Sequence, residues 1–99
     1  MKIYIAGKIT GLSDYRENFN KKQKELENKG HTVINPTGLY EILGDDFSHS
    51  DYMKICFSLV DLCDCVYLLD NWTDSTGAKL ERDYAMDKGK EITYQGGTK

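Results

Sequence analysis

The sequence predicts an α/β fold: a single small, doubly wound parallel sheet of four or five strands, flanked by helices. Three observations support this prediction. Short apolar or β-branched runs alternate along the chain with longer amphipathic stretches. The most continuous apolar run, residues 65–69, is typical of a central strand buried on both faces. Glycine-containing polar segments follow the first strand and this run, as expected for strand-to-helix loops.

The first part of the chain is expected to fold as strand, helix and strand. Residues 2–6 are apolar and β-branched, which favours a strand. Asp14 offers an N-cap oxygen, with Glu17 at capping-box spacing, for a helix that Gly30 ends. Residues 32–34 form the second strand, because the Asn-Pro pair that follows cannot continue a central ladder.

The rest of the chain predicts an irregular segment followed by helix, strand, helix and strand. Residues 37–50 form the longest irregular stretch, either a rim over a site or a plain surface loop. A helix is expected at 51–63, ahead of the central strand, and another at 77–88, which Gly89 ends. Residues 92–94 give a short last strand, which completes a flavodoxin-like order of elements.

Composition bounds the class of protein. The 99 residues make one domain over 1–95, followed by a flexible tail over 96–99. The net charge is −3 and no basic stripe is present, so we expect no nucleic-acid partner. The first apolar run is far shorter than the ~20 residues of a membrane span, so we expect a cytoplasmic protein without a membrane partner.

The cysteines, Cys56, Cys63 and Cys65, lie in apolar surroundings. Structural thiols are favoured over metal or redox chemistry, because the count is odd and the two histidines are distant in sequence. We therefore expect neither a metal nor a cofactor.

Polar residues follow the predicted central strand, where ligands bind in open α/β sheets. These residues are Asp74, Ser75, Thr76 and Gly77. Hydroxyls and free backbone N–H groups at such a junction can hold an anion. Glu81 is expected in the first turn of the next helix, pointing into the same crevice.

The loop after the first strand supplies the other half of the expected site. It contains Gly7, Lys8, Thr10 and Gly11. The loop lacks the third glycine of a dinucleotide fingerprint and the Gly-Lys-Ser/Thr of a phosphate loop. Lys8 either contacts a phosphate or is solvated at the tip of the loop.

Five segments occur along most of the chain in an order known from one superfamily. They are Tyr4-Ile5-Ala6-Gly7 with Thr10-Gly11, Arg16-Glu17-Asn18-Phe19, Val33-Ile34-Asn35-Pro36, Asp64-Cys65-Val66-Tyr67-Leu68-Leu69, and Asp74-Ser75-Thr76-Gly77-Ala78-Lys79-Leu80-Glu81. With them the chain resembles the nucleoside 2-deoxyribosyltransferase-like superfamily, and in particular its short bacterial and phage members.

The resemblance implies roles for three residues. Glu81 would be the nucleophile that attacks the anomeric carbon and expels the base, and Tyr4 would orient it by a hydrogen bond. Ser75 stands where relatives that act on 5′-monophosphates have serine and those that act on free nucleosides have aspartate. Without the resemblance, Glu81 is equally a helix-start charge, Tyr4 a packed core residue and Ser75 an N-cap.

One departure from the family pattern concerns the general acid. Relatives carry an aspartate eight residues before the first aspartate of the central strand, and this chain has Cys56 there. A thiol with a pKa near ~8.5 is a poor general acid.

Two further residues are candidates for ligand contacts. Trp72 either stacks on a base, shields the pocket, or contacts another subunit. Arg16 contacts a phosphate or a partner subunit's site, or it lies on the surface.

The expected function is cleavage of the N-glycosidic bond of a (deoxy)nucleoside 5′-monophosphate, by hydrolysis or by transfer. The alternative is a non-catalytic binder of a nucleotide or an ADP-ribose-derived signal, and a third possibility is a protein-interaction domain. The expected partner is a small-molecule nucleotide or nucleoside. We also expect a homodimer or larger assembly, because so small a domain gains buried area by pairing.

Overall fold

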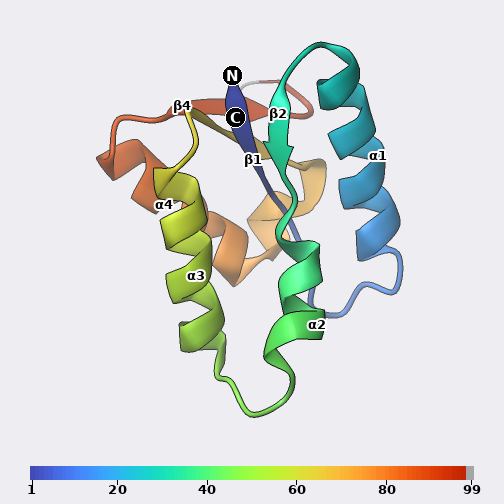
Figure 1. Cartoon of the computed structure of the whole chain (residues 1–99), viewed down its shortest axis with the longest axis vertical. Helices are drawn as coiled ribbons and strands as arrows, with labels where there is room; N and C mark the ends of the chain where they lie inside the picture. Colours follow the sequence, from blue (N-terminus) through green and yellow to red (C-terminus); the bar gives the residue numbers. More distant parts are fainter. Residues whose placement is uncertain (98–99) are drawn as a thin grey trace.

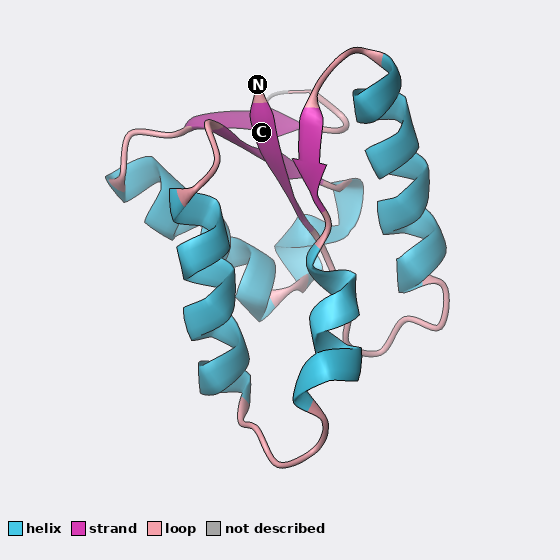
Figure 2. Cartoon of the chain, in the orientation of Figure 1, coloured by secondary structure: helices cyan, strands magenta, loops and turns pink. Residues whose placement is uncertain are grey.

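The computed structural model describes residues 1–97, which form one four-stranded parallel sheet with helices on both faces (Figures 1 and 2). The elements in chain order are β1 (Lys2–Ala6), α1 (Tyr15–Asn28), β2 (Thr32–Ile34), the 3₁₀ helix η1 (Pro36–Gly38), α2 (Leu39–Leu43), α3 (His49–Asp61), β3 (Cys65–Leu68), the 3₁₀ helix η2 (Asp70–Asp74), α4 (Thr76–Asp87) and β4 (Glu91–Tyr94). The predicted α/β fold is therefore confirmed, with four strands. The expected flexible tail lies partly outside the described residues, at 98–99.

The strand order is β2-β1-β3-β4, and every neighbouring pair is parallel. Tyr4 of β1 pairs with Ile34 of β2 and with Val66 of β3, so it stands at the centre of the sheet. Since all the strands run the same way, their carboxyl ends meet at one edge, where the following loops gather.

Alternation along the strands divides the core into two layers. Ile3 and Ile5 of β1 pack with Phe19 of α1 on one face. Tyr4 belongs to the other layer, which α3 and α4 cover. Figure 1 shows α1 and α3 on opposite sides of the sheet, which is the doubly wound arrangement.

The cap of α1 differs from the prediction. Asp14 is the N-cap residue, but its side chain makes no capping hydrogen bond. Its backbone has a ψ of 17°, outside the extended region that side-chain capping requires. The predicted capping box with Glu17 is therefore wrong.

The segment predicted to be irregular, 37–50, contains most of η1 and all of α2, and it includes the start of α3. The Ser48 hydroxyl accepts from the Asp51 N–H, and the Asp51 carboxylate accepts from the Ser48 N–H. This capping box starts α3 at His49, two residues earlier than predicted.

The three cysteines are free and buried, as expected for structural thiols. Among residues 1–97, none of the helices combines the length and the apolar character needed to cross a membrane.

Candidate functional site

A cavity of about 320 Å³ lies beside the carboxyl end of β1. Its walls come from the end of β1, the loop that follows it, the start of α3 and the start of α4. This volume is at the lower end of the range typical of small-molecule sites. Most of the residues predicted for the site line it: Tyr4, Gly7, Lys8, Thr10, Asp74, Ser75, Thr76, Gly77 and Glu81.

The wall of the cavity holds a buried carboxyl group, that of Glu81. Only 6% of Glu81 is exposed, and Tyr4 is fully buried beside it. The Tyr4 hydroxyl donates a short hydrogen bond to Glu81 Oε2. Tyr4 projects from β1, which is paired with a strand on each side, so this bond ties the carboxyl group to the interior of the sheet.

Burial dominates the ionisation of this pair. It raises the pKa of Glu81 to about 7, although hydrogen bonds from Tyr4 and Cys56 oppose the rise. Burial, and then the negative charge of Glu81, raise the pKa of Tyr4 well above its ordinary value. The phenol therefore stays protonated at neutral pH and keeps donating to a carboxyl group that is ionised in a large share of molecules.

Glu81 lies in the second turn of α4, because the helix begins at Thr76. The sequence predicted it for the first turn. A carboxylate gains from the helix dipole mainly in the first turn, so a helix-start role does not explain Glu81.

Cys56 belongs to the buried core cluster around Tyr4 and is not among the residues that line the cavity. Its side chain is fully buried, and burial together with the charge of Glu81 raises the pKa of the thiol to about 12. Such a thiol stays protonated and donates toward Glu81. It cannot release its proton to a leaving group near neutral pH.

The start of α4 contributes polar groups to the same cavity. Ser75 is the N-cap residue, and its hydroxyl accepts from the Ala78 N–H at 3.1 Å. The first backbone hydrogen bond of α4 runs from the Lys79 N–H to the Ser75 carbonyl. The N–H groups of Thr76 and Gly77 come before that donor, so the helix itself leaves them free for an anion. The N-cap role predicted for Ser75 is thus present, and Ser75 also lines the cavity.

The loop after β1 closes the opposite side. Gly7 packs so tightly that a Cβ atom would lie 2.8 Å from Cδ1 of Leu69. The backbone N–H of Lys8 donates to Asn71 Oδ1 at 2.9 Å, which ties the loop to η2. Gly11 has a φ of +83° and stands outside the lining residues.

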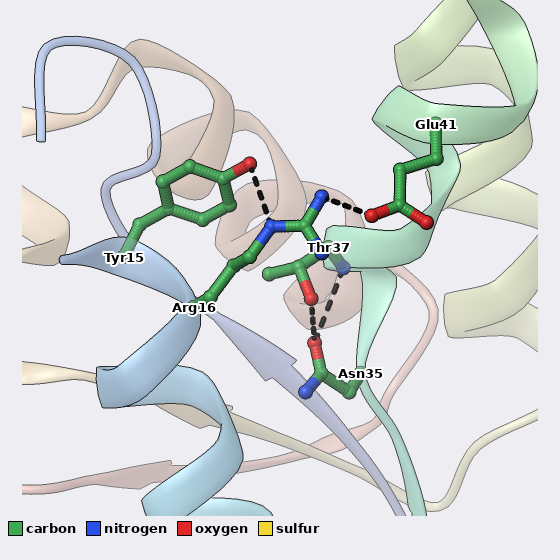
Figure 3. A network of polar contacts seen from close by, with 5 residues as sticks. All are labelled: Tyr15, Arg16, Asn35, Thr37 and Glu41. Atoms are coloured by element: carbon green, nitrogen blue, oxygen red, sulfur yellow. Dashed lines mark hydrogen bonds and ion pairs between the residues drawn. The ribbon is translucent and has the colours of Figure 1, made fainter. Parts of the chain in front are cut away.

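Arg16 lies away from the cavity, in a polar network between α1 and α2 (Figure 3). Its Nη2 atom is 2.6 Å from Glu41 Oε1, and its Nε atom donates to the Tyr15 hydroxyl at 3.3 Å. Asn35 caps η1 beside this network by accepting from the N–H and the hydroxyl of Thr37. Arg16 therefore lies at the surface, outside the residues that line the cavity.

Trp72 does not line the cavity either. It lies in η2 and is only 9% exposed. Its ring packs against Tyr94 at 5.7 Å between centroids, and the guanidinium of Arg82 lies 5.2 Å from its centroid. Its placement makes it a core residue, and the expected stacking on a bound base has no geometric support.

The sequence reasoning did not assign any residue of α3 to the site, yet His49, Tyr52 and Met53 from the start of this helix line the cavity. A smaller cavity of about 200 Å³ shares His49 and Tyr52 with the first and is lined on its far side by Leu43 and Phe47. The missed signal was the Ser-x-x-Asp pattern at Ser48, which would have moved the helix start to His49.

Comparison with known proteins gives a family and no activity. No curated protein matches the chain. A family model described as a domain of unknown function, DUF4406, matches residues 1–94. Because this match spans nearly the whole chain, the protein belongs to the DUF4406 family.

Proposed function

We propose that this protein binds a (deoxy)nucleoside 5′-monophosphate and cleaves its N-glycosidic bond, as an N-glycosidase or a deoxyribosyltransferase, with Glu81 as the nucleophile. The observation that carries the proposal is the buried Glu81–Tyr4 pair on the wall of a cavity of ligand size. The resemblance to nucleoside 2-deoxyribosyltransferase-like proteins supports the same assignment.

The chemistry follows from these two side chains. A Glu81 oxygen attacks C1′ of the sugar, the C1′–N bond breaks, and its electron pair leaves with the base. Water or a second base then takes the sugar from Glu81. A positive charge develops on the sugar in both transition states, so a carboxylate fixed in a buried site stabilises them more than one in water.

The start of α4 supplies a place for the 5′-phosphate. The hydroxyl of Ser75 and the N–H groups of Thr76 and Gly77 lie on the cavity wall one helical turn or more before Glu81. Lys8 lines the opposite side. This arrangement offers hydrogen bonds and positive charge to an anion, while Glu81 stays at the sugar.

One specific observation favours a second candidate, a binder that holds a nucleotide or an ADP-ribose-derived signal without cleaving it. The residue expected to protonate the leaving base is a buried cysteine whose pKa is raised to about 12. A site that has lost its general acid can keep its ligand and release no base.

The test is to incubate the protein with a panel of nucleosides and nucleotides, measuring free base by chromatography and binding by calorimetry. We expect base release from 5′-monophosphates, lowered at least ~100-fold by Glu81→Gln with binding retained. Glu91→Gln, at an exposed carboxylate of β4, is the matched control and should leave both unchanged.

The other outcomes separate the two candidates. Tight binding without base release identifies the protein as a non-catalytic binder. Base release that appears only in Cys56→Asp would show that the wild-type site lacks a general acid. Neither binding nor release from any nucleotide would refute both.

A further inference from the structure

The imidazole of His49 meets α4 at a position without a side chain. His49 is the first residue of α3, and its Nε2 atom lies 3.6 Å from where a Cβ atom of Gly77 would be. Met53, one turn further along α3, approaches the same point at 3.4 Å through its sulfur. A Cβ atom at position 77 would be in ordinary van der Waals contact with both side chains, so His49 and Met53 lie directly against the start of α4 at this wall of the cavity.

His49 therefore stands close to the proposed nucleophile. Positions 77 and 81 are one turn apart on the same face of α4, with Cβ positions about 5–6 Å apart. His49 and Glu81 both line the cavity. In glycosidases that work through a covalent intermediate, the acid and the nucleophile stand roughly 5–5.5 Å apart. His49 approaches α4 one turn before Glu81 and lines the same cavity, so a sugar bound against Glu81 would have the imidazole on the same wall.

The imidazole also has no polar partner among the described residues. His49 is exposed, and no hydrogen bond or ion pair engages its side chain among the described residues. Tyr52, the next polar side chain on this wall, donates to the carbonyl of Pro36 at 3.3 Å. Histidine is the side chain that most readily gives and takes a proton near neutral pH.

We propose that His49 is the general acid that protonates the leaving base, a role that Cys56 cannot perform. This inference rests on the proposed N-glycosidase activity. Glu81 attacks C1′ as the C1′–N9 bond of a purine nucleotide breaks. The electron pair of that bond goes to the base, the imidazolium delivers its proton to N7, and the base leaves neutral. In the second step the neutral imidazole takes a proton from the water that attacks C1′, Glu81 is released, and the imidazolium is restored.

The decisive experiment compares the rate of base release from a purine nucleotide with the rate from its N7-methylated counterpart. The spontaneous rate of release without protein is subtracted for each substrate. The methylated base already carries a positive charge and leaves without a proton. His49→Gln should slow release from the unmodified nucleotide by about 100-fold or more, and release from the methylated one by less than about threefold. His31→Gln removes the other histidine, which contacts the amino terminus far from the cavity, and should change neither rate.

Each other outcome decides something. Equal slowing of both substrates would mean that His49 only positions the ligand, and unchanged rates would mean that it has no part in the reaction; either result overturns the inference. In either of these cases, loss of base release from both substrates in Glu81→Gln would leave the proposed function standing, although the role of His49 is refuted. If the wild-type protein releases neither base, the proposed function fails, and the role of His49 fails with it. Urea unfolding of His49→Gln separates a chemical defect from a folding defect.

Discussion

Replacing Glu81 by glutamine should stabilise the fold above pH 7 and have little effect on its stability near pH 5. Glu81 is 6% exposed, and its pKa is raised because burial penalises the charged form. As the pH rises, the unfolded chain therefore loses the Glu81 proton at a lower pH than the folded protein does. Stability from this group is fully present below the unfolded pKa of 4.5 and is lost as pH rises through the folded pKa of about 7.

The magnitude follows from the two pKa values. A rise from 4.5 to about 7 corresponds to about 3 kcal/mol, at 1.36 kcal/mol for each pKa unit. Most of it, about 2.5 kcal/mol, is lost between pH 5 and pH 8. Glutamine is neutral throughout this range, and its side-chain carbonyl still accepts from Tyr4. Glu81→Gln should therefore lack this loss, and above pH 7 it should exceed the wild type by up to about 3 kcal/mol.

The assay is urea unfolding of the wild type, Glu81→Gln and Glu91→Gln at half-unit steps from pH 5 to pH 8. Glu91 is exposed, so its variant controls for the loss of one carboxylate. The free energy of unfolding of the wild type should fall relative to Glu81→Gln as the pH rises, and the control should follow the wild type. Parallel curves for the wild type and Glu81→Gln would refute the argument that Glu81 ionises in a desolvated site.

Two further predictions concern the helix starts that form the cavity. Ser75→Asp should weaken binding of 5′-monophosphates by calorimetry while leaving free nucleosides less affected, because aspartate keeps the cap on Ala78 but adds a like charge; Ser75→Asn keeps the cap without the charge, and equal losses in both variants would contradict an anion role. Ser48→Ala should lower the free energy of unfolding by about 1 kcal/mol, because the N–H of Asp51 loses its acceptor. Ser50→Ala, on the exposed side of the same turn, should cost less, and equal costs would show that the capping box contributes nothing.

Local patterns in the sequence were sufficient for the order of the four strands and the three longer helices, but not for α2. The apolar run ending at Leu69 and the polar junction at Ser75 and Gly77 are each recognised from residues close together in the chain. Parallel strands bring their carboxyl ends to one edge, so this junction and the loop at Gly7 could be predicted to face one cavity.

The tertiary structure decided which side chains reach that cavity. Trp72 follows the same strand as Ser75, yet packing against Tyr94 of the last strand turns it into the core. Arg16 lies near the first loop in sequence, but Glu41 of α2 holds it at the surface. Neither partner is visible locally, because each comes from a distant part of the chain.

The sequence by itself determined the fold class and the placement of Glu81 near the helix start that contains Gly77. Both depend on short-range periodicity and on the geometry of parallel strands. Only the tertiary structure decided the environment of Glu81 and the nearness of His49. Burial depends on what every neighbouring element excludes from water, and the contact of His49 with Gly77 depends on how α3 packs on α4. The ionisation of Glu81 and the source of a proton for the leaving base therefore depend on packing between elements that the linear sequence keeps apart.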